Sequence, residues 1–302
     1  MTIQRVAIIG LGLLGGSIGL AVREYAPGIV TTGYDRDEGV RKVAGERGLV
    51  GTVCDSAAEA VREADLVVLC VPVGAMEEAA AQLADHIPKT AIISDVGSSK
   101  QSVSEALSRA LPGRTIIPAH PVAGTEQSGP EAGFASLFTN RWCILTPVDG
   151  THENALAALS EFWTKLGATV EIMDAEHHDL VLAVTSHIPH LIAFTIVGTA
   201  SDLEEVTRSE VIKYSAGGFR DFTRIAASDP VMWRDVFLNN KSAVLEMLGR
   251  FTEDLTALQR AIRSGDGDAL HELFSRTRAI RREVIKEGQD DDRPDFGRED
   301  HG

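Results

Sequence analysis

Positive charge is in short supply in this sequence. The 302 residues include 29 Lys and Arg against 44 Asp and Glu, which gives a formal net charge of −15 at pH 7. A chain this acidic is repelled by the phosphate backbone of nucleic acids and by anionic membrane surfaces. We therefore expect no nucleic-acid partner and no membrane partner.

Cysteine is also scarce. Cys54, Cys70 and Cys143 are the only three, and their spacing matches neither a CxxC pair nor a metal-ligand pattern. We therefore expect neither a disulfide framework nor a zinc site, and we expect no other metal. Neither a basic leader nor an uncharged stretch of bilayer length is expected, so the sequence favours a cytoplasmic enzyme.

A glycine-rich turn follows the first predicted strand, Val6–Ile9. Gly10, Gly12 and Gly15 form a GxGxxG motif ahead of a predicted helix over Ser17–Tyr25. In such motifs the first glycine permits a tight turn, the second lets the backbone approach a pyrophosphate, and the third lets the helix pack closely on the strand. The helix N-terminus then faces the phosphates. The expected phosphate-binding residues are Gly10, Gly12, Leu13, Leu14 and Gly15.

An acidic residue stands at the position where a ribose-binding carboxylate is expected. The second predicted strand, Val30–Tyr34, leads directly into Asp35. A carboxylate there accepts hydrogen bonds from ribose hydroxyls and repels a 2′-phosphate, which favours NAD over NADP. Because Arg36 stands beside Asp35, NADP remains an alternative cofactor. The alternative interpretation of Asp35 is a turn residue after a strand.

Strands and helices alternate through the first half, which predicts an α/β fold built on a doubly wound, Rossmann-type parallel sheet. Further strands are predicted over residues 66–71, 91–95, 115–119, 142–146 and 169–173, with helices over residues 37–47, 56–63, 76–86, 101–111 and 152–166. The last two strands are expected to extend the same sheet. From Asp174 onward only helices are predicted.

The change of pattern suggests three parts. We expect an NAD-binding domain over residues 1–173, an all-helical substrate and dimerisation domain over residues 174–287, and an acidic flexible tail over residues 288–302. Two apolar stripes, running from Val244 to Ile262 and from Leu270 to Val284, are too long for such a small domain to bury alone. They predict a homodimer formed through the C-terminal helices.

The segment PAHPVAGTEQSG, residues 118–129, contains too many prolines and glycines for a regular element. It places His120 between two prolines, with Thr125 and Glu126 close behind. A rigid loop of this kind presents a proton acceptor to a substrate. An ordinary surface loop remains the alternative. Ser98 and Ser99, which follow another predicted strand, are either helix-capping residues or members of the same site.

The helical half contributes further candidates. His187 and His190 stand three residues apart around Pro189, and either contact substrate or are buried histidines with internal partners. Arg220 and Arg224 are four apart, so both lie on one helical face. Two adjacent guanidiniums suit a dianionic substrate, although a solvent-facing pair bridged to acids fits the pattern too.

Together, five segments closely resemble the prephenate and arogenate dehydrogenases of tyrosine biosynthesis: GLGLLGGSIGLA, SDVGSSK, HPVAGTEQSG, SHIPH and GGFRDFTRIAASDPVMWRD. The resemblance covers residues 3–286. It implies NAD-dependent oxidative decarboxylation of prephenate to 4-hydroxyphenylpyruvate. Hydride leaves ring C4 for the nicotinamide, carbon dioxide is lost, and the ring becomes aromatic.

The resemblance also implies roles for single residues. His120 matches the histidine that accepts the proton of the C4 hydroxyl, and Ser99 matches a serine that hydrogen-bonds that histidine or the hydroxyl. His190 matches a substrate-binding histidine, and Arg224 the arginine that holds a substrate carboxylate. Thr125, Glu126 and Arg220 match further substrate-binding or gating positions, with Arg220 standing where some relatives have lysine.

Three alternatives remain at this stage. Arogenate carries an ammonium where prephenate carries a keto group, and relatives that prefer it tend to have an acid near residues 138–142. This chain has Asn140 and Arg141 there, which favours prephenate over an arogenate or dual-specificity cyclohexadienyl dehydrogenase. A 3-hydroxyacid dehydrogenase is disfavoured because its glycine-rich turn followed by a lysine is missing. A non-catalytic NAD-binding regulator would have no need of His120, Ser99 and Arg224 together.

Overall fold

The computed structural model describes residues 2–125, 127–202, 213 and 217–286. The chain forms two compact units, Met1–Val244 and Leu245–Gly302. The domain boundary expected after Met173 stays a prediction. The acidic tail over residues 288–302 lies outside the described residues.

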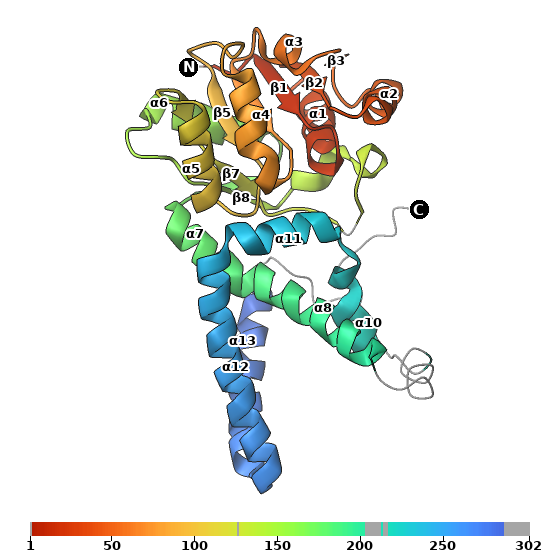
Figure 1. Cartoon of the computed structure of the whole chain (residues 1–302), viewed down its shortest axis with the longest axis vertical. Helices are drawn as coiled ribbons and strands as arrows, with labels where there is room; N and C mark the ends of the chain where they lie inside the picture. Colours follow the sequence, from red (N-terminus) through yellow and green to blue (C-terminus); the bar gives the residue numbers. More distant parts are fainter. Residues whose placement is uncertain (1, 126, 203–212, 214–216, 287–302) are drawn as a thin grey trace. The chain divides into compact units, whose positions relative to one another are not determined.

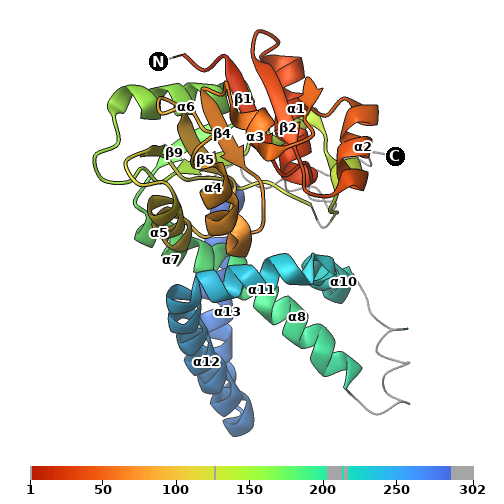
Figure 2. The same ribbon diagram turned by 45° about the horizontal axis from the view of Figure 1, so that its top comes forward.

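A six-stranded parallel sheet forms the centre of the first unit, with strand order β3-β2-β1-β4-β5-β6. This order confirms the predicted doubly wound sheet (Figures 1 and 2). Its strands are β1 (Arg5–Ile9), β2 (Val30–Tyr34), β3 (Thr52–Val53), β4 (Leu66–Leu69), β5 (Ile92–Asp95) and β6 (Thr115–Ile116).

Helices cover both faces of this sheet, as its nearly continuous apolar strands require. The helices between these strands are α1 (Leu13–Tyr25), α2 (Glu38–Arg47), α3 (Ala57–Val61), η1 (Val73–Ala75), α4 (Met76–Leu83) and α5 (Gln101–Ala110). In β1, Val6 and Ile8 join the core cluster that contains Ile18 of α1. Ala7 and Ile9 join the opposite cluster, which contains residues of α3, α4 and α5.

The expectation that residues 142–146 and 169–173 extend this sheet is wrong. They form β8 (Trp142–Leu145) and β9 (Thr169–Ile172), which make a separate three-stranded sheet with β7 (Ala119–Pro121). β7 pairs antiparallel with β8, and β8 pairs parallel with β9. The predicted strand over residues 115–119 is therefore divided between two sheets. The segment 118–129, expected to hold no regular element, contributes β7.

The division of that strand has a local cause at Pro118. The amide of Ile117 donates the last hydrogen bond toward the large sheet, to the carbonyl of Ile93 at 2.9 Å. Pro118 has no amide hydrogen and cannot continue the ladder. Its carbonyl instead accepts a hydrogen bond from Thr146 beyond β8, at 2.9 Å. The chain thus leaves one sheet and enters the other within two residues of His120.

Segments before and after β8 complete this part of the unit. They are η2 (Pro130–Ala132), η3 (Ala135–Phe138) and α6 (Glu153–Lys165). Phe138 and Trp163 are fully buried and meet edge to face, with ring centroids 5.3 Å apart. The aromatic residues of α6 are therefore core residues.

Among the described residues after β9 only helices occur, in agreement with the predicted change of pattern. In the first unit they are α7 (Ala175–Leu182), the π-helical turn η4 (Ala183–His187), α8 (Ile188–Ser201), α10 (Gly217–Thr223), η5 (Arg224–Ala227) and α11 (Pro230–Asn239). The helix α12 (Lys241–Ser264) begins at the end of this unit, and α13 (Gly267–Lys286) lies in the second unit.

One segment, Ala175–Ser201, is long and apolar enough to cross a membrane by length and composition alone. The expectation that no stretch reaches this length is therefore wrong. Three polar residues of the segment, His178, Asp179 and His187, are nevertheless buried and hydrogen-bonded within the protein. These buried polar contacts hold the first part of the segment, up to His187, within the first unit.

Close backbone packing explains why glycines occupy the start of α1. The helix begins at Leu13, four residues earlier than expected, with Gly12 as its N-cap. A Cβ atom added to Gly15 would lie 1.9 Å from the carbonyl oxygen of Gly10. Gly10 itself has φ of +100°, a conformation that side chains rarely adopt. Glycine is a poor helix former, but at Gly15 it allows the close contact between helix and strand.

Substitution of Gly15 tests this contact. Gly15→Ala is expected to lower the free energy of unfolding by roughly 1–3 kcal/mol, because the added methyl group must displace backbone. Gly45→Ala is the matched control: this glycine lies in α2 with no atom within 4 Å of its added Cβ, and alanine there is expected to stabilise by about 0.5–1 kcal/mol. Urea denaturation of both variants measures the difference, and equal stability would contradict the contact.

Candidate active site

The glycine motif lies where the first strand meets α1, and its geometry fits a dinucleotide. A Cβ added to Gly12 would meet nothing within 4 Å, so space is open beside the backbone. No side chain caps the N-terminus of α1, and its first turn contains no acid. The amides of Leu13 and Leu14 belong to this half-buried first turn, which suits a pyrophosphate.

Asp35 lies directly after β2, at the same edge of the sheet. Its Oδ2 accepts a hydrogen bond from the amide of Leu11 at 2.9 Å, and its Oδ1 accepts one from the amide of Asp37 at 3.0 Å. The half-buried carboxylate is thereby fixed beside the glycine turn, as a ribose-binding acid requires. Arg36 is exposed, and the structure gives it no contact with this carboxylate.

His120 is the central residue of β7, opposite Ile144 of β8. Only 8% of its surface is exposed. Burial lowers the pKa of His120 well below its usual value, and the nearby His178, Lys100 and His187 lower it further. The imidazole is therefore neutral at pH 7 and able to accept a proton.

A buried ion pair fixes the backbone next to His120. Lys100 and Asp95 are both fully buried and in direct contact. The ammonium of Lys100 also donates to the carbonyl of Ala119 at 2.7 Å, and Asp95 accepts from the amide of Ala119 at 3.2 Å. Burial raises the pKa of the Asp95 carboxyl and lowers that of the Lys100 ammonium, and each charge opposes the shift of the other. The pair holds both polar backbone groups of the residue before His120.

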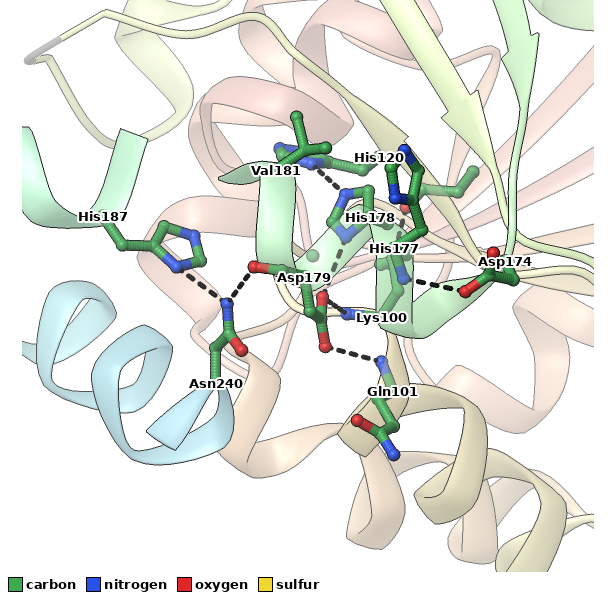
Figure 3. A network of polar contacts seen from close by, with 12 residues as sticks. Lys100, Gln101, His120, Asp174, His177, His178, Asp179, Val181, His187 and Asn240 are labelled. Atoms are coloured by element: carbon green, nitrogen blue, oxygen red, sulfur yellow. Dashed lines mark hydrogen bonds and ion pairs between the residues drawn. The ribbon is translucent and has the colours of Figure 1, made fainter. Parts of the chain in front are cut away.

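The ring of His120 contacts another histidine and not the expected serine. Its Nδ1 lies 2.8 Å from Nε2 of His178, whose Nδ1 lies 2.8 Å from Oδ1 of Asp179. Figure 3 shows these residues in one network with Lys100 and Asn240. Ser99 is fully buried beside Lys100, and its hydroxyl has no hydrogen-bond partner among the described residues. A buried hydroxyl of this kind is available to a ligand.

His190 and Arg224 lie close together in the helical part of the first unit. The segment η5, which contains the half-buried Arg224, packs against α8, and Arg224 contributes to lowering the pKa of His190. Burial is the larger cause of that shift. The ring of His190 stacks on Trp233 with centroids 3.7 Å apart, and its Nδ1 hydrogen-bonds the carbonyl of Ser186 at 2.8 Å. These two contacts fix the orientation of the His190 ring.

The remaining expected site residues differ in their surroundings. His187 is fully buried, with Nδ1 3.1 Å from the side-chain nitrogen of Asn240, and burial lowers its pKa to about 4. Arg220 lies exposed on α10, whereas Arg224 follows the end of that helix in η5. Thr125 is exposed and accepts from the amide of Gln127 at 3.1 Å. Glu126 lies outside the described residues. No group of three metal ligands occurs in the part of the chain that the structure describes.

Sequence reasoning missed the residues that hold His120. The sequence predicts no role for Lys100, His178 or Asp179. The available signal was the occurrence of a histidine and an acid inside an otherwise apolar helix. No local motif joins them to Lys100, since 79 positions separate Lys100 from Asp179.

Comparison with known proteins gives a consistent result. Residues 18–172 match the family model for the nucleotide-binding domain of prephenate dehydrogenase, and residues 174–276 match the one for its dimerization domain. A cyclohexadienyl dehydrogenase of Zymomonas mobilis is 47% identical, over 92% of this chain and 95% of its own.

Solved structures agree. The prephenate dehydrogenase of Aquifex aeolicus, crystallised with hydroxyphenyl propionate and NAD+, superposes with a TM-score of 0.87 at 33% identity and covers 94% of this chain and 99% of its own. An arogenate dehydrogenase of Synechocystis superposes with a TM-score of 0.78 at 26% identity, over 93% and 99%. From its motifs, its fold and these matches, the chain belongs to the prephenate and arogenate dehydrogenase family of oxidoreductases.

Proposed function

We propose that this protein is an NAD-dependent prephenate dehydrogenase, which converts prephenate and NAD to 4-hydroxyphenylpyruvate, carbon dioxide and NADH. The observation that carries the proposal is His120: a buried, neutral imidazole held by a fixed backbone. Removal of hydride from a carbon that bears a hydroxyl requires a group to take the hydroxyl proton. His120 is suited to that task.

NAD is the proposed cofactor. The open backbone at Gly12, the uncapped start of α1 and the fixed carboxylate of Asp35 support it. Gly10, Leu13, Leu14 and Gly15 complete the proposed binding turn, and the structural relative from Aquifex aeolicus contains NAD+. Bound NAD would supply the hydride acceptor. Asp35 would select it over NADP, because a carboxylate repels a 2′-phosphate.

The protein residues then have separate tasks. His120 accepts the proton of the C4 hydroxyl as hydride leaves C4. The buried and unpartnered hydroxyl of Ser99 is proposed to hydrogen-bond the same oxygen or the ring of His120. Loss of the ring carboxylate as carbon dioxide follows, and its electron pair passes through the ring to the C4 oxygen, which takes the proton back from His120. Formation of the aromatic ring makes the reaction favourable.

Substrate binding is assigned to the helical part. Arg224 is proposed to hold one substrate carboxylate through paired charge-assisted hydrogen bonds. His190, oriented by its stack on Trp233, is proposed to contact the substrate through Nε2. Thr125, Arg220 and Glu126 are proposed as binding or gating positions from the sequence alone.

The choice between two substrates is the finer part of the proposal. Arogenate requires an acid for its ammonium, whereas Asn140 and Arg141 stand in the segment where such an acid is expected. This favours prephenate. A dual-specificity or arogenate enzyme is the second candidate, supported by the cyclohexadienyl and arogenate dehydrogenases among the relatives.

We also propose that the protein is a homodimer formed through its helical part. Residues 174–287 are proposed as the substrate and dimerisation domain. The proposed location is the cytoplasm. The apolar residues of the helices favour it, because several are exposed in the single chain. They include Val184, Ile196, Val197, Leu245, Leu255, Ile262, Phe274 and Ile280. The matched family model for this region is that of a dimerization domain.

An assay of the purified protein tests the function directly. Prephenate and arogenate are each supplied with NAD and with NADP, and absorbance at the nicotinamide band is followed. We expect reduction of NAD with prephenate as the preferred pair. No reduction with either substrate would refute the enzymatic proposal, and a preference for arogenate would refute the finer assignment.

Replacement of the proton acceptor is expected to act on turnover. His120→Asn should lower kcat by roughly 10²–10⁴-fold with little change in KM, because the amide cannot take the proton. His177→Asn is the matched control, since His177 is an exposed histidine on α7 and should keep wild-type rates. Unchanged kcat in His120→Asn would show that another group is the base.

Replacement of the carboxylate ligand is expected to act on binding. Arg224→Ala should raise the KM for prephenate by roughly 10- to 100-fold, the equivalent of a lost charge-assisted hydrogen-bond pair. Arg234→Ala removes an exposed guanidinium that pairs with Asp235 and should leave KM unchanged. If both variants gave the same KM in steady-state assays, Arg224 would not be the ligand.

The pH dependence follows from the burial of His120. The base must be neutral, and burial lowers its pKa well below 6.5. Activity should therefore persist at pH 6.5 and fall only at lower pH, as the imidazole becomes protonated. A profile of kcat/KM against pH measures the acid limb, and a midpoint above 6.5 would contradict a buried neutral base.

A further inference from the structure

The contact between His120 and His178 has a definite polarity. Asp179 is a carboxylate that accepts hydrogen bonds from the amides of Lys100 at 2.7 Å and Gln101 at 3.0 Å. Its Oδ1 also lies 2.8 Å from Nδ1 of His178. A carboxylate only accepts, so the hydrogen of the His178 ring is on Nδ1. Burial lowers the pKa of His178, so this ring carries a single proton.

The position of the proton on His120 follows from that on His178. With its proton on Nδ1, His178 offers only a lone pair at Nε2. That atom lies 2.8 Å from Nδ1 of His120, so His120 must donate there. Its other nitrogen, Nε2, then carries the lone pair. This is the only form of the neutral ring that holds His178 at one end and can accept a substrate proton at the other.

We propose that His178 and Asp179 are positioning residues that fix His120 as its Nδ1–H tautomer and so keep Nε2 ready to accept a proton. The proposal rests on the proposed function of His120 and deepens it. Asp179 does this while also binding the first backbone amides at the start of α5, so the orientation of the base is tied to the end of strand β5 and its following turn. The logic is that of an acid–histidine pair that sets the tautomer of a catalytic group.

Two substitutions of His178 distinguish a hydrogen bond to His120 from the presence of any polar side chain at position 178. The side chain of glutamine reaches the place of Nε2 and offers an amide oxygen to His120. The side chain of asparagine is shorter and reaches only the place of Nδ1, next to Asp179. Both variants keep a buried amide beside Asp179, so they are matched in polarity.

The expected results differ between the two. His178→Asn should lower kcat by roughly 10- to 100-fold, part of the contribution of a positioned base, with the KM values for NAD and prephenate within about twofold. His178→Gln should keep most of the wild-type kcat. Asp174→Asn, a change of acid to amide in the exposed N-cap of the same helix, should leave both constants unchanged.

The tautomer itself is measured by ¹⁵N NMR of histidine-labelled protein at pH 8, with the His120 signals assigned by their loss in His120→Asn. We expect the Nδ1–H form in the wild type and in His178→Gln, and a mixture of forms in His178→Asn. This readout does not depend on turnover, so it stands even if the assay shows no dehydrogenase activity.

Several outcomes would overturn the proposal. An Nε2–H form of His120 in the wild type does so alone, whether or not the variants fold. Wild-type kcat in His178→Asn, or an equal loss in His178→Gln and His178→Asn, would do the same. So would an equal loss in Asp174→Asn, which would assign the effect to disturbance of α7.

Discussion

The carboxylate of Asp179 is the constraint on which the candidate site depends. It lies on α7 yet binds the backbone amides of Lys100 and Gln101, at the start of α5. Lys100 in turn contacts Asp95 and the carbonyl of Ala119, beside His120. One buried acid therefore joins the first helix after β9 to the edge of the nucleotide-binding sheet. Lys100 and Asp95 form a buried charged pair, and removal of one partner from such a pair lowers the free energy of unfolding by about 3–5 kcal/mol. We therefore expect the loss of either residue to disturb the whole arrangement.

The arrangement also explains how a buried histidine can serve as a base. Desolvation keeps His120 neutral, so that its ring can accept a proton. Neutrality alone does not fix the orientation of the ring. The three-residue strand β7 fixes its backbone, and the buried pair of Lys100 and Asp95 fixes the residue before it. The catalytic proposal thus requires no unusual chemistry from His120 itself. It requires that the surrounding buried charges stay paired, which the hydrogen bonds of Asp95 and Asp179 achieve.

The sequence predicted those features that are local. Strand and helix alternation, the GxGxxG turn and Asp35 led to the doubly wound sheet, because each depends on neighbouring residues. Resemblance predicted roles for His120, Ser99, His190 and Arg224, and these roles stay predictions, whereas the family is confirmed. The second sheet was missed, because Pro118 divides a predicted strand between two sheets, and the sequence alone does not show the position of the second sheet. The contact of His120 with His178 was missed because it joins residues 58 positions apart and depends on an acid that itself caps a distant helix.

A structure of the protein with NAD and 4-hydroxyphenylpropionate bound tests the central claim most directly, since the phenol oxygen of that ligand marks the place of the C4 hydroxyl. The account predicts this oxygen at about 3 Å from Nε2 of His120. It also predicts the hydroxyl of Ser99 within hydrogen-bond distance of the oxygen or of the ring, and the ligand carboxylate against Arg224. A phenol oxygen facing a different residue, with Nε2 of His120 left without contact, would contradict it.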